Sequence, residues 1–113
     1  MNSLDETFFA LSDPTRRKTV DLLRKRSRRA GELAEALAMS PAAMSRHLRV
    51  LRTSGLVEEE HGGDDARVRM YRLRQERLVE LRSWIDEALA LWEGELASFK
   101  SYAERTRGKK ARS

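Results

Sequence analysis

Small, hydroxyl-bearing and cationic side chains are spaced along residues 40–49 so that one side of a helix would carry them together. The candidates are Ser40, Pro41, Ala42, Ser45, Arg46 and Arg49. Intervals of three and four residues place side chains on the same helix face. Small residues let a helix approach closely, hydroxyls donate or accept, and arginine bridges two acceptors on guanine. The chemistry predicted for this face is the reading of base edges in a DNA major groove.

A helix predicted over residues 41–53 must position these side chains. Ser40 suits the N-cap, Pro41 suits the first helical position, and Gly55 suits the left-handed residue that follows a helix. At about 1.5 Å per residue this helix spans roughly 20 Å, enough to lie across a major groove. The opposite face carries an apolar stripe predicted to be buried, which is Met44, Leu48 and Leu51.

A shorter helix is predicted just before it, over residues 32–37, with Leu33 and Leu37 on one face and Ala38–Met39 as the turn. Two helices joined by so short a turn are typical of a helix-turn-helix. The alternative for residues 41–53 is an ordinary surface helix with solvated arginines. The cap, turn and stop at helix-turn-helix spacing favour a recognition helix.

Beyond Gly55 the pattern changes to two strands, over residues 56–60 and 67–73, joined by the glycine-rich loop 61–66. Arg67 and Arg69 alternate with apolar residues, so one face of the hairpin is predicted to be basic. A basic hairpin after a helix-turn-helix is a wing that contacts DNA, and its alternative is a solvated ribbon. The glutamates at 58–60 either pair with arginines opposite or weaken the hold on phosphate.

The remaining helices are predicted over residues 4–11, 14–25 and 76–102. Asp13 suits the N-cap of the second, whose first turn carries Arg16, Arg17 and Lys18. Positive charge there opposes the helix dipole, which indicates phosphate as a partner. The last helix has a long apolar stripe from Leu78 to Phe99. This stripe predicts a dimer interface shared with the first helix, and the alternative is burial against the domain's own body.

Composition and charge agree with a small DNA-binding protein. The 113 residues suggest one domain over 1–104, followed by a basic tail over 105–113 that is expected to be disordered. Residues 14–77 hold 16 basic and nine acidic side chains, whereas residues 78–104 hold two basic and six acidic ones. A basic middle can present a positive face to phosphate. With no membrane-length apolar run and no signal peptide, a soluble cytoplasmic protein without membrane contact is expected.

Two stretches carry a family resemblance, ALSDPTRR at residues 10–17 and SPAAMSRHLRVLRTSGLV at residues 40–57. Together they resemble the ArsR family of winged-helix repressors, over about residues 4–102. The resemblance implies a mainly α fold with a small β-hairpin, in the order α-α-α-α-β-β-α, with a short extra strand near residues 28–30. It implies a homodimer that pairs through its first and last helices and represses from a palindromic operator, often at its own promoter. Carried over by position, the recognition-helix contacts would be Ser40, Ala42, Ser45, Arg46 and Arg49, and the wing contacts would be Arg67 and Arg69.

Many members of that family sense metals, and here the sequence departs from them. It has no cysteine, and the last helix has acids at Asp86, Glu87, Glu93 and Glu95 but no histidine. His47 is predicted to be a packed or capping residue. No metal site and no cofactor are therefore expected, and the sequence names no inducer. The ALSDPTRR form resembles the metal-free members of the family.

The predicted function is a sequence-specific DNA-binding transcriptional regulator, a homodimeric repressor with double-stranded DNA as its partner. The alternative is a winged-helix module that packs on protein. Outward arginines favour DNA, since protein-binding faces favour aromatics, whereas the three wing glutamates favour the alternative. The narrow major groove of RNA disfavours RNA. An enzyme is not predicted, because no histidine lies beside a nucleophile and an acid and no glycine-rich phosphate loop is present.

Overall fold

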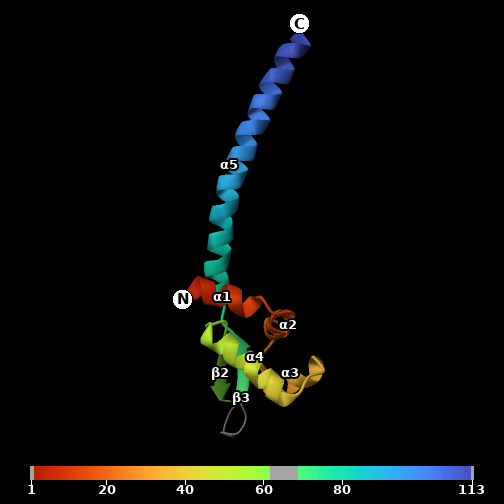
Figure 1. Ribbon diagram of the computed structural model, residues 1–113, viewed down its shortest axis with the longest axis vertical. Coiled ribbons are helices and arrows are strands. Elements are labelled where there is room, and N and C mark those ends of the chain that lie inside the picture. Colours follow the sequence, from red (N-terminus) through yellow and green to blue (C-terminus); the bar gives the residue numbers. More distant parts are fainter. Residues whose placement is uncertain (1, 62–68, 113) are drawn as a thin grey trace. The chain divides into compact units, whose positions relative to one another are not determined.

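The computed structural model describes residues 2–61 and 69–112. It divides into two compact units, residues 1–81 and 82–113. The first unit holds four helices, namely α1 (Ser3–Leu11), α2 (Pro14–Leu23), α3 (Ala30–Ala36) and α4 (Pro41–Thr53), and the strands β1 (Arg28–Arg29), β2 (Val57–His61) and β3 (Arg69–Leu73) (Figure 1). The second unit is the greater part of α5 (Glu76–Arg112), which starts in the first.

This order confirms the predicted mainly α fold with a small hairpin, including the short strand near residues 28–30. The three strands form one antiparallel sheet in the order β1-β3-β2. Tyr71 of β3 lies between Arg28 of β1 and Glu59 of β2. The hairpin of β2 and β3 is the predicted wing, and its tip at residues 62–68 lies outside the described residues.

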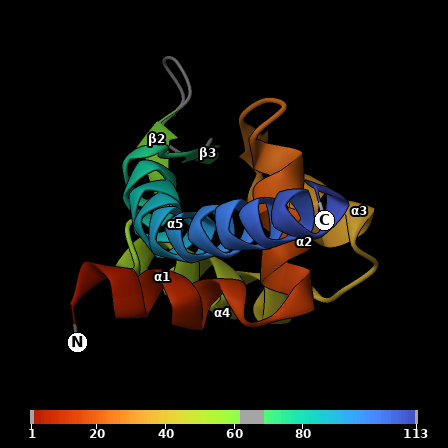
Figure 2. The same ribbon diagram turned by 90° about the horizontal axis from the view of Figure 1, so that it is seen from above.

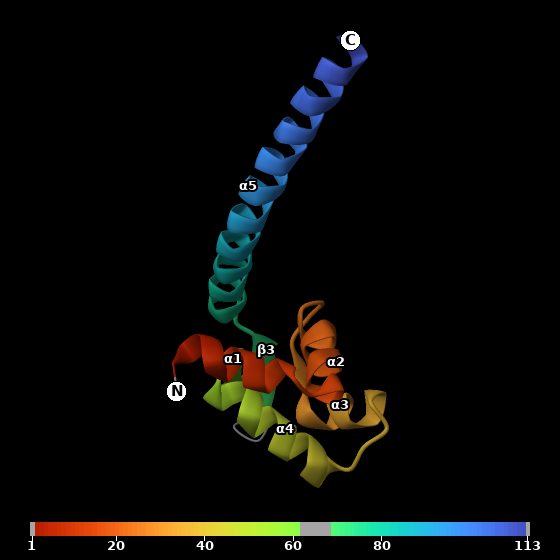
Figure 3. The same cartoon turned by 45° about the horizontal axis from the view of Figure 1, so that its top comes forward.

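The core of the first unit is built around one face of α4. Figures 2 and 3 show α4 lying along α1, and α3 packs against α4 as the other half of the helix-turn-helix. Met44, Leu48 and Leu51 are buried as predicted, against Leu33 of α3 and Leu56 before β2. Burying one such side chain stabilises the fold by about 1.5–3 kcal/mol, so this stripe fixes which face of α4 points outward.

The ends of α4 follow the predicted chemistry. Ser40 Oγ accepts from the Ala43 N–H at 3.1 Å, and Pro41 occupies the first helical position. At the other end Gly55 has a φ of 83°, and the Leu56 N–H donates to Leu51 O at 3.1 Å. This is a Schellman motif, in which a left-handed residue turns the chain out of the helix.

The turn between α3 and α4 uses the same motif with an alanine in the left-handed position. Ala38 has a φ of 53°, and the Met39 N–H donates to Ala34 O at 2.9 Å. A side chain with a Cβ costs about 1–2 kcal/mol in this conformation. The turn was predicted at Ala38–Met39, but its strain was not.

Three predicted boundaries need correction. α2 ends at Leu23 rather than near Lys25. α3 begins at Ala30 rather than Glu32, because Glu32 Oε1 accepts from the Arg29 N–H at 3.3 Å and caps the start from within. α5 continues to Arg112 rather than ending near Tyr102. Its last ten residues are mostly Ala, Glu, Lys and Arg, which are good helix formers, and a single glycine costs only about 1 kcal/mol. The division into a domain and a separate tail stays a prediction.

Candidate nucleic-acid interface

The exposed face of α4 carries every candidate contact predicted for the recognition helix. Ser40, Pro41, Ala42, Ser45, Arg46 and Arg49 are all exposed. Burial of the opposite stripe leaves this face outward, with small residues near the helix start and arginines behind them. The arrangement matches what a helix needs to enter a major groove.

The start of α4 also offers donors to an anion. Pro41 has no N–H, and the Ala43 N–H is taken by Ser40, so the Ala42 N–H stays available to an outside acceptor. Ser40 accepts through its oxygen, which leaves its O–H to donate outward. Such a helix start suits a phosphate oxygen, because the amides and the helix dipole both favour negative charge.

Arg46 and Arg49 are the cations on this face. Within residues 2–61 and 69–112, neither side chain forms an ion pair or a hydrogen bond. An arginine already held by a carboxylate must exchange partners before it can bind a base or a phosphate. These two guanidinium groups need no such exchange.

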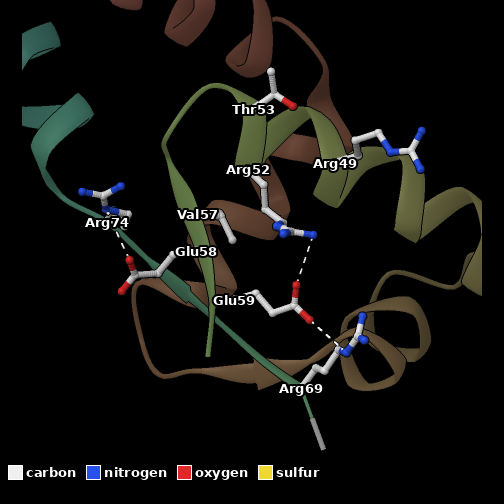
Figure 4. Close-up of a pocket in the computed structure, with 8 residues that line it drawn as sticks. All are labelled: Arg49, Arg52, Thr53, Val57, Glu58, Glu59, Arg69 and Arg74. Atoms are coloured by element: carbon white, nitrogen blue, oxygen red, sulfur yellow. Dashed lines mark ion pairs between the residues drawn. The ribbon is translucent and has the colours of Figure 1, made fainter. Parts of the chain in front are cut away.

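A groove of about 750 Å³ separates the second half of α4 from the sheet (Figure 4). Its lining residues are Arg49, Arg52, Thr53, Val57, Glu58, Glu59, Arg69 and Arg74. The groove therefore combines four arginines with two glutamates. The sequence analysis did not predict Arg52 and Arg74 as site residues. Arg52 could have been found from its position one helical turn after Arg49.

The glutamates of β2 pair with arginines, which answers the question left open by the sequence. Glu58 pairs with Arg72 and lies 3.5 Å from Arg74. Glu59 Oε2 lies 3.1 Å from Arg52 Nη1, and its Oε1 lies 3.2 Å from Arg69 Nε (Figure 4). Glu59 thus bridges α4 and β3 by two ion pairs, although the approach of Arg69 lacks hydrogen-bond geometry and leaves Oε1 without a hydrogen-bond partner among the described residues.

The two predicted wing contacts have different outcomes. Arg69 has a 62% exposed side chain on β3 and lines the groove together with Arg49, but Glu59 holds its guanidinium. Arg67 lies outside the described residues. The structure brings Arg69 and the recognition helix to one site, and the role of both wing arginines stays a prediction.

The first turn of α2 has a structural explanation, and the phosphate interpretation of Arg16 is wrong. Arg16 is buried, and its Nε and Nη2 donate to Ala10 O at 2.6 Å and Phe9 O at 3.1 Å. Arg17 Nη1 donates to Leu11 O at 2.8 Å. These cations satisfy the carbonyls at the C-terminus of α1, where positive charge is favourable. His47 packs beside Arg16, with Nδ1 3.4 Å from Nη1.

Asp13 caps α2 as predicted, and its carboxylate accepts from the Arg16 backbone N–H at 3.1 Å. This hydrogen bond holds the pKa of the Asp13 carboxyl below its usual range. The Arg26 side chain, at 3.0 Å, and the Arg29 backbone N–H likewise lower the pKa of Glu32. Both shifts favour the charged form of a helix-capping carboxylate.

Two further observations concern metals and membranes. Among the described residues, no three His, Cys, Asp or Glu side chains gather where they could hold a metal ion. Within the same residues, no helix has the length and apolarity to cross a membrane. The absence of a metal site stays a prediction.

A helix-turn-helix with an outward polar face, followed by a wing, defines the class of winged helix-turn-helix proteins. Residues 13–59 match the model of the bacterial regulatory protein, arsR family. The chain is 39% identical over 84 residues to the HTH-type transcriptional regulator Rv2034 of Mycobacterium tuberculosis, covering 74% of this chain and 76% of that one. The chain belongs to the ArsR family of winged helix-turn-helix transcriptional regulators.

Two other similarities support the assignment. The chain is 37% identical over 60 residues to the transcriptional repressor SdpR of Bacillus subtilis, covering 53% of this chain and 67% of that one. The solution structure of a homodimeric winged helix-turn-helix DNA-binding domain, Mb0332 from Mycobacterium bovis, matches with a TM-score of 0.61 and 25% identity. That match covers 78% of this chain and 79% of the other. Membership in a family of regulators does not favour the protein-packing module.

Proposed function

We propose that this protein is a homodimeric repressor that binds a palindromic operator through α4 and the wing. The observation that carries the proposal is the exposed face of α4, on which Arg46 and Arg49 have no partner among the described residues. Arg46 and Ser45 would read base edges. Ser40, Pro41 and Ala42 at the helix start, and Arg49 and Arg69 beside the groove, would meet the backbone. Arg67, the other wing contact expected from the sequence, would do the same.

The homodimer is supported by apolar surface on α5. Ile85, Leu89, Trp92, Leu96 and Phe99 are between 41% and 70% exposed, at intervals of three and four residues. A stripe of this length is unfavourable in water, and a second copy would cover it with the same residues. A two-fold dimer presents two recognition helices to half-sites one helical turn apart, which requires an inverted repeat. The homodimeric relative of M. bovis supports the same assembly.

Repression, rather than activation, is supported by the similarity to SdpR, a transcriptional repressor. A bound dimer blocks a promoter without any further activity, so no cofactor or catalytic group is needed. We place this action in the bacterial cytoplasm, where the DNA lies.

Selection from a random DNA library tests the proposal. Duplexes retained by the full-length protein are amplified, rebound and sequenced. We expect an inverted repeat whose half-sites are separated by about 10 base pairs, centre to centre. Enrichment of a single half-site would contradict the dimer, and recovery of no common sequence would contradict sequence-specific binding.

A further inference from the structure

Glu59 occupies the place between two arginines of the groove that a bound anion would take. Its two carboxylate oxygens lie 3.1 Å from Arg52 Nη1 on α4 and 3.2 Å from Arg69 Nε on β3. The Glu59 side chain is 13% exposed, whereas those of Arg52 and Arg69 are 50% and 62% exposed. Figure 4 shows the carboxylate lying between the two guanidinium groups. A phosphodiester likewise offers two oxygens and one negative charge.

The other charged residues of the groove offer Glu59 no alternative partner that would release Arg52 and Arg69. Glu58 is engaged with Arg72 and Arg74, and Arg74 Nε also lies 3.5 Å from Glu76. Among the described residues, Arg49 alone of the four groove arginines has no carboxylate partner. A phosphate entering the groove therefore meets Arg49 directly, but reaches Arg52 and Arg69 only by exchange with Glu59.

This exchange carries an electrostatic penalty on any DNA, and only the correct DNA sequence offsets it. The displaced carboxylate stays near the phosphate, because Glu59 is mostly buried on a strand, and like charges repel. Phosphate contacts form with any DNA, whereas base contacts form only with the correct sequence. Only the correct sequence supplies the extra favourable contacts with α4 that would drive the exchange.

We propose that Glu59 is a specificity-determining residue that competes with DNA phosphate for Arg52 and Arg69. The inference rests on the proposed DNA-binding function and deepens it. On random DNA the two ion pairs of Glu59 persist, and binding is weak. On the operator the arginines transfer to the backbone, and the wing and the recognition helix hold the same phosphates.

Glu59→Gln tests the inference, because it removes the charge and keeps the shape of the side chain. The matched control is Glu60→Gln, which makes the same charge change on the same strand. Glu60 pairs with Arg72 at 3.7 Å, accepts from Ser27 at 3.4 Å and does not line the groove. Fluorescence anisotropy gives the Kd of each protein at several salt concentrations, on a scrambled duplex and on the duplex enriched by wild-type selection.

We expect Glu59→Gln to bind the scrambled duplex roughly tenfold more tightly than Glu60→Gln does, because a like charge has been removed beside the phosphate. The slope of log K against log salt should steepen by about one to two, since each further phosphate contact adds about 0.9. For Glu59→Gln, the ratio of the Kd on the scrambled duplex to the Kd on the selected duplex should fall towards one. Adding Arg52→Ala and Arg69→Ala should abolish the gain.

Equal behaviour of Glu59→Gln and Glu60→Gln would overturn the inference, because the gain would then reflect net charge alone. Weaker binding of Glu59→Gln to both duplexes, with an unchanged Tm, would make Glu59 a support of the wing instead. Should Glu59→Gln fail to fold, Glu59→Ala carries the same test, since it also removes the negative charge beside the phosphate. Wild-type protein that binds neither duplex at low salt would refute the proposed function itself, a result distinct from the others.

Discussion

At the scale of single residues, five arginines of the first unit fall into three groups that the sequence alone does not separate. Arg16 is buried and binds carbonyls of α1. Arg52 and Arg69 are exposed but held by Glu59. Arg46 and Arg49 are exposed and have no partner among the described residues. Only the third group can contact DNA without first losing an interaction.

Arg46→Ala should weaken binding to the selected operator by about 1–3 kcal/mol and relax its sequence preference, because a bidentate contact to guanine is lost. Anisotropy on the operator and on single-base variants measures both effects. The control is Arg24→Ala, which removes the exposed arginine that directly follows α2 and lies 4.0 Å from Asp21. An equal loss on scrambled DNA would instead make Arg46 a phosphate contact.

These residue-scale assignments show where sequence reasoning ends. Exposure of residues 40, 42, 45, 46 and 49 was predictable, because helical periodicity and one apolar stripe determine it. The pairing of Glu59 with Arg52 was not, because it depends on how a strand packs against a helix distant in sequence. The unfavourable position of Arg16 in the dipole of α2 correctly indicated that its side chain has an electronegative partner. The predicted partner was phosphate, whereas the structure shows the carbonyls of α1.

At the scale of elements, the ends of the helices position the interface. Asp13, Ser40 and Gly55 were predicted correctly because caps have strong local preferences. The end of α5 was predicted ten residues too early, since a basic composition indicates disorder although its residues are good helix formers. The Asp13 cap and the turn at Ala38 permit direct tests of stability.

Ala38→Gly should stabilise the protein by about 0.5–1 kcal/mol, because glycine relieves the left-handed strain and loses only part of this to unfolded-chain entropy. Ala38 is exposed, so removing its methyl group leaves no cavity. Urea unfolding followed by circular dichroism measures the change. Ala42→Gly, which lies in the regular first turn of α4, is the control and should be destabilising. A loss of stability in Ala38→Gly would contradict the strained turn.

Asp13 should make the stability of the protein depend on pH. Its pKa is lower in the folded than in the unfolded chain, so its contribution is present above about pH 4 and is lost as the pH falls through the folded pKa. Asparagine caps equally well but does not titrate. Relative to wild type, Asp13→Asn should therefore gain free energy of unfolding between pH 5 and pH 2. Parallel curves for the two proteins would contradict this assignment.

At the scale of the whole molecule, one chain offers one recognition helix and a long exposed apolar stripe on α5. The first feature suits half of an operator, and the second suits a second copy. The sequence predicted both, because apolar periodicity over many turns is a strong signal. It could not decide between burial within the chain and pairing with another, and the 41–70% exposure of the stripe favours pairing.

At micromolar protein concentration, Leu96→Glu should convert the dimer to a monomer. The change places a charge in the apolar stripe of α5, where the leucine is 49% exposed. Sedimentation velocity measures the change. Ser98→Glu adds the same charge on the opposite side of α5 and should remain dimeric. A wild-type protein that sediments as a folded monomer at these concentrations would refute the dimer.

The central claim is that this family member recognises a specific DNA sequence through α4. Its most direct test is the anisotropy titration of the wild-type protein on the selected and the scrambled duplex at several salt concentrations. We expect the selected duplex to bind about a thousandfold more tightly or better, and both affinities to fall steeply with salt. Equal affinities for the two duplexes would contradict the claim and leave only nonspecific attraction to phosphate.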